Sequence, residues 1–565
     1  MKKIILFMIL VLAICASCVN LDQQPKAQAS STNWYSDEAQ IQSAVNYLYD
    51  HQYWHDNILG YSGYWNDALT DDWTNRYAVN DITGGTLNSQ TAWITQVWQI
   101  LYRGIANANV VLEHLEENTF LDEIKLAQYK ALTLLARAYM YSKLIFYYGD
   151  VPFFTTQMSM EDAYALGRTS KETILKQIYE DYDYAIANLP DQWTSGITYP
   201  NKGAAYGFKA RTALWMNDWS TVVTAAKGCM DTGQYELEPN FIDVFTKTTK
   251  ESLFSLPYSI ASTIYPDWPK CQQHATRTIG GTDFVQPSWD LFCSFLCSDG
   301  LPIDESPLYD PQNPFKNRDP RCAYTIVEFG TPHLGVIYQP HPDSLTVLNI
   351  NTGERVKNMD SKGNIQWASF NGLMWNKQIQ DDWADFYVEQ DYVVLRYADV
   401  LLMYAEAKIE LNQIDQSVVD VINRVRARAY GVDYTQTDSY PAVALGSQSE
   451  MRKIVRLERR MELANEGRRY KDIIRWGIAE KVLNRPIYGL LDLDPLREKI
   501  VNQGLWFFPD VPPIDEDGCA DFTDMYNRGL IKLLANRHFE SKQYLWPIPA
   551  SEILICPNLE QNPNY

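Results

Sequence analysis

Apolar residues recur at helical spacing in one segment after another between residues 93 and 230, and this pattern restricts the chain to a helical architecture. Glycine and proline mark the connections, as in Tyr148–Pro152 and Leu189-Pro190. The expected helices are Trp93–Leu115, Ile124–Tyr147, Lys171–Leu189, Gly203–Trp215 and Ser220–Met230.

Small residues stand at positions of these segments where two helices could approach closely. They are Ala136, Ala138, Ala204, Ala205 and Ala210. With them, the helix pairs resemble degenerate tetratricopeptide hairpins. A solenoid of such pairs is a scaffold rather than an active site.

The composition changes between about residues 255 and 390. Pro, Gly, Asn, Asp and isolated aromatic residues are frequent there, and apolar residues no longer recur at helical spacing. Alternating runs at Thr325–Phe329 and Gly335–Tyr338 predict short strands. Long ordered loops on a rigid scaffold tend to carry function, so we expect this region to face a ligand. Further helices are expected at Val393–Leu411, Val418–Ala429, Met451–Glu466 and Arg469–Val482, followed by an irregular tail from about 483 to 565.

The N-terminus has the features of a secretory signal peptide. Lys2 and Lys3 precede an apolar run from Ile4 to Ile14, which is shorter than the roughly 20 residues that span a bilayer as a helix. The run ends at Ala16-Ser17-Cys18, which resembles a bacterial lipobox. We expect Cys18 to be the lipidated residue after removal of residues 1–17. The acyl chains would anchor the protein to a membrane, with residues 18–35 as a tether.

Composition limits the classes of function. The formal net charge of −21 argues against nucleic acid as a partner, because phosphate binding needs clustered Lys and Arg. Aromatic residues make up 13% of the chain, including 17 Trp and 37 Tyr, and such residues suit surfaces that bind sugar rings. With 565 residues, the chain is long enough for one large domain or two closely packed lobes.

The nine cysteines show no zinc-ligand pattern, so no metal or cofactor is expected. Cys293 and Cys297 could share one helix face, and a disulfide or a ligand contact is possible there. Buried free thiols are the favoured interpretation.

A series of motifs extends along some 500 residues. In chain order they are Tyr148–Pro152, Tyr199–Ala205 with Lys209–Arg211, Tyr235–Leu237, Asp299-Gly300 with Asn317–Arg321, Leu395–Ala407, Ile422–Arg426, Glu458–Ala464 with Glu466–Arg469, and Tyr544–Pro549 with Asn558 and Gln561–Pro563. Each motif alone is weak, but in this order they resemble the SusD/RagB family from end to end.

The resemblance implies a mainly α fold with tetratricopeptide-like hairpins packed against a loop-rich lobe with short strands. It also implies a glycan-binding lipoprotein facing the cell exterior from the outer membrane, and a partner TonB-dependent transporter of the SusC type. The expected division of the chain is a signal peptide (1–17), a lipidated tether (18–35), an N-terminal helical region (36–254), a ligand-facing insertion (255–390) and a C-terminal region (391–565).

The motifs themselves are better interpreted as scaffold. We expect Arg396, Asp399 and Glu406 to pair with neighbouring helices. Glu458–Glu462 with Arg468 and Arg469 predicts an ion-pair network between helices, in which each exposed pair contributes little to stability.

Sugar binding needs flat aromatic faces flanked by side chains that bond hydroxyl groups. Residues 61–77 supply this mixture densely and lie just before the first hairpin helix, a stretch that contributes to the glycan site in the SusD/RagB family. The predicted ligand-binding residues in it are Trp65, Asp67, Asp72, Trp73, Arg76 and Tyr77. A second candidate segment, Tyr265–Arg277, adds Tyr265 and Trp268, and a third is Trp367–Trp383 with Trp375 and Asn376.

Two alternatives compete with glycan capture. A glycoside hydrolase would need two carboxylates about 5–9 Å apart across the scissile bond. The adjacent Asp71 and Asp72 are expected to point in divergent directions, and the sequence contains no nucleophile elbow, HExxH or phosphate-binding loop. The second alternative keeps the fold but captures peptides. We expect a binder and not an enzyme.

Overall fold

The computed structural model describes residues 34–55, 67–75, 79–194, 198–245, 249–263, 268–379, 383 and 388–565, with the backbone alone described at 268–270. The expected signal peptide, Cys18 and most of the tether lie outside these residues.

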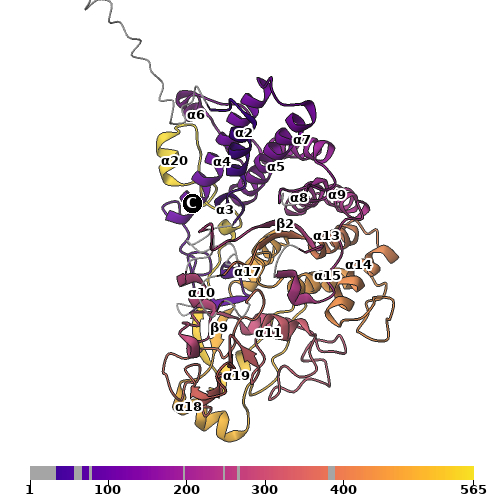
Figure 1. The fold of residues 1–565 in the computed structure, drawn as a ribbon. Coiled ribbons are helices and arrows are strands. Elements are labelled where there is room, and N and C mark those ends of the chain that lie inside the picture. Colours follow the sequence, from indigo (N-terminus) through magenta and orange to yellow (C-terminus); the bar gives the residue numbers. More distant parts are fainter. Residues whose placement is uncertain are drawn as a thin grey trace, which may run out of the picture.

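Helical hairpins form the N-terminal part of the molecule (Figure 1). Its helices are α2 (Glu38–Leu48), α3 (His51–Trp54), α4 (Ala92–Glu116), α5 (Glu123–Tyr148), α6 (Met160–Ala165), α7 (Lys171–Asn188), α8 (Lys202–Trp215) and α9 (Trp219–Asp231). The five helices predicted between residues 93 and 230 are thereby confirmed to within one residue at each end. Asp122, Ser170 and Asn201 cap α5, α7 and α8 by accepting backbone N–H bonds, which fixes where each helix begins.

Consecutive helices pack side by side in a continuous array. Contacts link α4 to α5, α5 to α7, α7 to α8 and α8 to α9, and α9 then packs against α13 (Tyr397–Glu410) of the C-terminal half. The array continues through α14 (Gln416–Ala429) and α15 (Gln448–Leu463). All five alanines predicted at close contacts are fully buried. At Gly207 an added Cβ would lie 2.7 Å from a methyl of Leu253, so α8 needs a residue without a side chain there.

The remaining elements are short and lie mainly in the lower part of Figure 1. The helices are α10 (Trp268–His274), α11 (Trp289–Ser294), α12 (Arg321–Thr325), α16 (Arg469–Arg475), α17 (Ala479–Val482), α18 (Leu493–Lys499), α19 (Thr523–Asn527) and α20 (Ala550–Ile555), with 3-10 turns at Phe241–Phe245, Arg277–Ile279, Val501–Gln503 and Ser541–Tyr544. The strands are β1 (Trp73–Asn75), β2 (Ser252–Leu256), β3 (Val285–Pro287), β4 (Pro332–His333), β5 (Val336–Ile337), β6 (Thr346–Leu348), β7 (Arg355–Lys357), β8 (Tyr392–Arg396), β9 (Pro486–Gly489) and β10 (Lys532–Asn536).

The strands of the described residues pair two by two and antiparallel: β1 with β3, β2 with β8, β4 with β5, β6 with β7, and β9 with β10. The pairing of β2 with β8 joins segments about 140 residues apart, and both strands lie against α8. Trp546, near the C-terminus, stacks on Tyr147 of α5 at 3.9 Å between ring centroids, which brings the tail back to the first hairpins. The mainly α fold predicted from the sequence is confirmed.

Four local predictions were wrong. The segment Val393–Leu411 begins with β8, and its helix starts at Tyr397 because Val393, Leu395 and Arg396 pair with β2. Thr325–Phe329 is not a strand, since Thr325 ends α12 and Ile326 makes only an isolated bridge to Trp375. The helix predicted for Met451–Glu466 ends at Leu463. The segment Arg469–Val482 is broken at Gly477, which has a positive φ.

The predicted ion pairs form, but they are buried rather than exposed. Glu462 of α15 accepts hydrogen bonds from Arg396 at 2.7 Å, from Arg321 at 3.2 Å and from Arg428. Arg396 also bonds Glu251 and Glu466. Such groups are costly to desolvate, so the network holds only because each charge has several partners.

The other scaffold charges pair in the same way. Asp399 accepts from Arg211 at 2.7 Å and from Arg459 at 3.0 Å. Glu406 is held by both terminal nitrogens of Arg475. The expectation that these motifs serve the scaffold is therefore confirmed for Arg396, Asp399 and Glu406.

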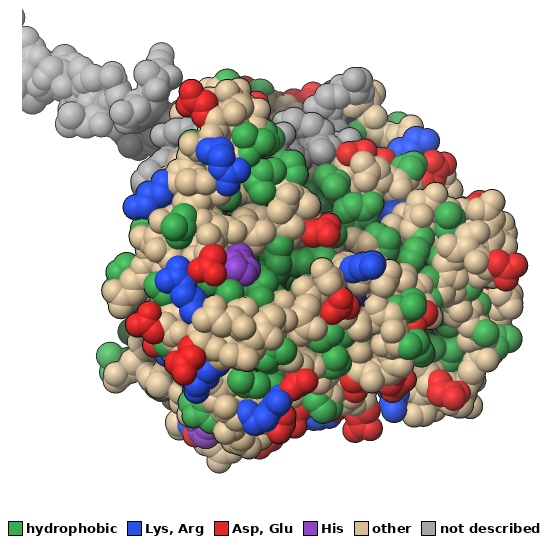
Figure 2. Space-filling view, turned by 90° about the horizontal axis from the view of Figure 1, so that it is seen from below, with side chains coloured by type: hydrophobic (Ala, Val, Ile, Leu, Met, Phe, Trp, Pro, Cys, Tyr) green, Lys and Arg blue, Asp and Glu red, His purple; other side chains and the backbone are tan. Residues whose placement is uncertain are grey.

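The cysteines of the described residues are free thiols, and Cys293 and Cys297 are both buried, as favoured from the sequence. Burial raises the pKa of the Cys297 thiol. No helix among the described residues combines the length and the apolar character needed to cross a membrane. The face seen in Figure 2 carries acidic, basic and apolar side chains interspersed.

Candidate functional site

The first candidate segment contains β1, which pairs with β3, a strand shortly after the second candidate segment. Trp73 lies opposite Pro287 and Asn75 opposite Val285, although about 210 residues separate the strands. Just beyond the pairing, the Ser288 N–H donates to the Asp72 carbonyl at 3.0 Å and the Ser288 hydroxyl donates to the Asp71 carbonyl. The same hydroxyl accepts from Leu291 N–H to cap α11. These hydrogen bonds therefore hold residues 67–75 against the N-terminus of α11.

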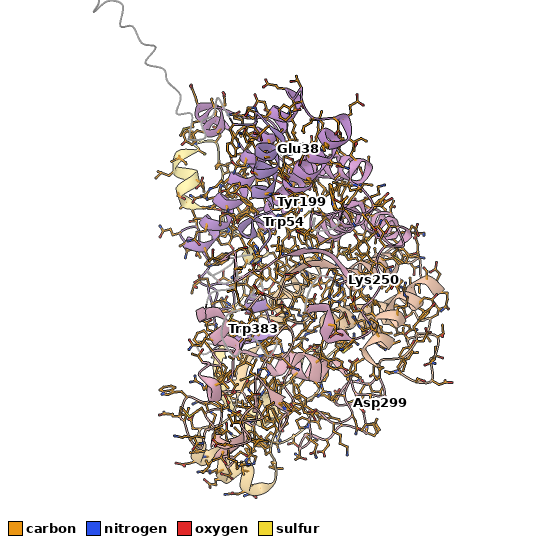
Figure 3. All side chains as sticks on the ribbon, in the orientation of Figure 1. Glu38, Trp54, Tyr199, Lys250, Asp299 and Trp383 are labelled. Atoms are coloured by element: carbon orange, nitrogen blue, oxygen red, sulfur yellow. The ribbon has the colours of Figure 1, made fainter. Side chains whose placement is uncertain are left out.

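The third candidate segment reaches the same place through Trp383. Its ring packs edge-on against His274 of α10 at 5.8 Å, and its indole N–H donates to Gln390 at 3.2 Å. A small apolar cluster of Cys271, Ala275, Leu334, Trp383 and Val388 surrounds the contact. Figure 3 labels Trp383, together with Trp54 from the hairpin helices. Because α10 also contacts β3, three segments that are distant in the sequence converge here.

The predicted ligand-binding residues divide into two groups. Trp65, Arg76, Tyr77 and Tyr265 lie outside the described residues, and only the backbone of Trp268 is described, at the start of α10. Asp67, Asp72 and Trp73 are described, and all three are buried, with Trp73 4% exposed. In this conformation they support the segment from within.

Asp71 and Asp72 do not diverge as expected. Both carboxylates accept hydrogen bonds from the same nitrogen of Arg460, at 2.9 and 2.6 Å, and Asp71 also accepts two from Arg469. The sequence expectation was wrong because it assumed an extended backbone, whereas Asp71 and Asp72 fold around one guanidinium. Two buried carboxylates held by arginines in this way serve to anchor the segment to α15.

The pKa values of the carboxyl groups of Asp71 and Asp67 are shifted in opposite directions. Burial alone would raise the pKa of Asp71, but Arg469 and Arg460 hold it well below its usual range. Burial and the charge of Asp72 raise the pKa of Asp67 to about 7, and the Gly467 N–H, 3.2 Å away, is its described hydrogen-bond donor. The anchoring cluster therefore contains a carboxyl group that titrates near neutral pH.

An aromatic group that the sequence reasoning did not single out lies where α3 ends. Tyr258 packs on His51 at 4.7 Å, and His55 packs on Tyr392 at 4.3 Å. The Tyr258 hydroxyl lies 3.3 Å from Nε2 of His55. The spacing of His51 and His55, four residues apart, was a signal that they share a helix face.

The other two tryptophans of the third segment, Trp367 and Trp375, differ in exposure. Trp375 is fully buried, whereas Trp367 is 65% exposed at a turn closed by the Ala368 N–H bond to Ile365. The sequence alone could not show which of the two side chains is exposed and so accessible to a ligand.

Comparison with known proteins identifies the fold family. A model described as the SusD family matches residues 250–565, and a second model, described as starch-binding associating with outer membrane, matches residues 20–214. The SusD-like protein P25 of Formosa agariphila is 25% identical over 84% of this chain and 90% of its own length.

Solved structures agree. A SusD-like carbohydrate-binding protein from Bacteroides fragilis is 28% identical, with a TM-score of 0.77 over 93% of this chain and 99% of its own. A laminarin-binding SusD-like protein shares the fold at a TM-score of 0.59 and 18% identity, covering 94% of this chain and all of its own. Since the first family model alone matches more than half of the chain, this protein belongs to the SusD family.

Proposed function

We propose that this protein is a cell-surface glycan-binding lipoprotein that delivers polysaccharide or oligosaccharide to a partner TonB-dependent transporter of the SusC type. The observation that carries the proposal is the 28% identity, over 93% of the chain, to a structure described as carbohydrate-binding. The convergence of three aromatic segments around β1, β3 and α10 supports it.

The site fits such a ligand on physical grounds. A glycan is recognised by aromatic faces and by a few fixed polar groups, and these are most effective on rigid supports. Asp71 and Asp72 provide that rigidity, because they tie the first segment to α15 through Arg460. We propose Trp65, Asp67, Asp72, Trp73, Arg76, Tyr77, Tyr265 and Trp268 as the ligand-binding set, with Trp65 as the leading stacking residue and the buried members as its support.

Calorimetry with a panel of polysaccharides and a panel of peptides tests this function. We expect binding to at least one glycan, and Trp65→Ala should weaken that binding by roughly 30-fold, or about 2 kcal/mol, because a stacking residue in a pre-formed site is lost.

Tyr164→Ala removes an exposed aromatic side chain on α6 and serves as the control, with no change expected. Binding to peptides alone would support the peptide-capturing alternative. If Trp65→Ala binds like the parent while Trp367→Ala loses affinity, the glycan contacts Trp367 instead.

A hydrolase remains the weaker alternative. The acidic pair adjacent in sequence, Asp71 and Asp72, is buried and held by Arg460 and Arg469. New reducing ends after incubation with the bound oligosaccharide would favour hydrolysis, and an unchanged oligosaccharide is the expected result.

The proposed anchor is an acyl group on Cys18 that holds the protein on the outer face of the outer membrane. Cys18→Ala should move the protein from the membrane fraction to the soluble fraction, because the acyl chains supply the membrane affinity. From detergent-solubilised membranes, the unmodified sequence should co-purify with a large barrel protein. An unchanged membrane fraction for Cys18→Ala contradicts the anchor, and recovery of the chain alone contradicts the partner.

A further inference from the structure

A cavity of about 720 Å³ lies between α15 and three loops, at residues 300–305, 442–444 and 514–518. It is large enough for a disaccharide-sized ligand. Ser449, Arg452, Lys453, Arg456 and Arg460 line it from α15, and their spacing of three and four residues places them along one helix face. None of these residues belongs to the three candidate glycan segments, although Arg460 also holds Asp71 and Asp72 of the first segment from behind.

On the inner wall of the cavity, the positive charges of the arginines are balanced by buried carboxylates. Arg426 pairs with Glu458 at 2.7 Å, and Arg460 and Arg469 hold Asp71. The N–H groups of these arginines already donate to buried carboxylates, so these arginines are not available to a ligand. The charge that a ligand would meet comes from the outer part of the helix face.

Two cations on that outer part retain bonding capacity. Lys453 is exposed and makes no ion pair within the described part of the chain. Arg456 lies over the Trp476 ring at 4.9 Å, and its side chain is 24% exposed. The nearest carboxylate to Arg456, that of Glu410 at 3.9 Å, is already held by two nitrogens of Arg452 at 2.7 Å each. One helix face thus presents positive charge that is only partly neutralised.

The loops that line the cavity form a wall of the other polarity. Asp515 is neutralised by Lys481 at 3.2 Å, and Asp517 is paired with the same lysine. Glu305 and Glu516 line the cavity as well, with Glu516 4.0 Å from the same lysine, and carboxylates of this kind accept hydrogen bonds from hydroxyl groups. Ile454, Leu457 and Ile514 add apolar surface to the cavity.

We infer that this cavity binds a small acidic saccharide, with its carboxylate toward Lys453 and Arg456 and its hydroxyl groups toward Glu305 and Glu516. A sugar acid combines an anion, several hydroxyl donors and an apolar ring face in one disaccharide-sized molecule, which matches the three kinds of wall. A neutral sugar has no carboxylate to pair with Lys453 and Arg456. A fatty acid has no hydroxyl groups to donate to Glu305 and Glu516.

Calorimetry with digalacturonate and with its methyl ester tests the inference, because esterification removes the charge and keeps the rings. The acid should bind at least about tenfold more tightly than the ester, and the preference should shrink in high salt. Lys453→Glu should weaken binding of the acid by about tenfold or more.

Lys250→Glu is the matched control, since Lys250 is an exposed lysine that pairs with Glu236 and does not line the cavity, so its replacement should leave binding unchanged. Trp65→Ala should also leave it unchanged, which separates this site from the proposed glycan site. Equal binding of acid and ester, no binding of the acid, or undiminished binding by Lys453→Glu would each overturn the inference. Tighter binding of an acidic dipeptide than of the sugar acid would overturn the saccharide class.

Discussion

Replacing Glu462 by glutamine should destabilise the folded protein by about 3–5 kcal/mol, because three buried arginines then lose their shared carboxylate. Arg396, Arg428 and Arg321 all donate to Glu462, and together they lower its pKa to about 2 although burial alone would raise it. In a chain of this size the loss corresponds to a decrease in melting temperature of about 2.5–4 °C. Thermal unfolding followed by circular dichroism measures it.

The control for this substitution is Asp231→Asn on α9. Asp231 pairs with Lys227 at 2.7 Å, but both side chains are largely exposed, so this pair should contribute less than about 0.5 kcal/mol. Should Glu462→Gln melt within about 1 °C of the parent, the buried network would not be the stabilising element described above.

Asp67 should make the protein less stable as the pH rises from about 4 to 7. An ordinary aspartate has a pKa of 3.8, whereas the pKa of Asp67 is about 7 in the folded protein, so the folded state binds one more proton than the unfolded state in this window. Asp67→Asn removes this dependence on pH. The variant should therefore gain stability relative to the parent between pH 5 and pH 8, by about 2.5 kcal/mol, as measured by urea unfolding at each pH.

Asp71→Asn provides the contrast. Arg469 and Arg460 hold the pKa of Asp71 far below its usual range, so this carboxylate is ionised at both pH values. Its replacement should destabilise the protein at pH 5 and at pH 8 alike. A stability difference between Asp67→Asn and the parent that does not change with pH would mean that Asp67 is ionised throughout.

The sequence predicted the helical hairpins well because their signal is local. A stripe of apolar residues at helical spacing specifies both the helix and the face that it buries, and the breakers at Tyr148–Pro152 mark its end. The wrong strand at Thr325–Phe329 shows the limit of this reasoning. A short alternating run fits a strand, but its partner is set by contacts that local sequence does not contain.

The candidate site was harder to predict for the same reason. Aspartate is usually found at the surface, yet Asp71 and Asp72 are both buried. They pair with Arg460, which belongs to a helix almost 390 residues further along the chain. The pairing of Trp73 with Pro287 is equally non-local. Sequence could locate the three candidate segments, while their meeting point required the fold.

The buried pairs between α8, β8 and α13 have a consequence for the energetics of association. Arg211 donates to both the Val394 carbonyl and Asp399, so separating these elements would expose several charges at once. Backbone amides in α13 should therefore exchange with deuterium only through rare cooperative openings, while the short α20 should exchange by local fraying. These elements are therefore already ordered before any association, so that binding would not have to order them at a cost in conformational entropy.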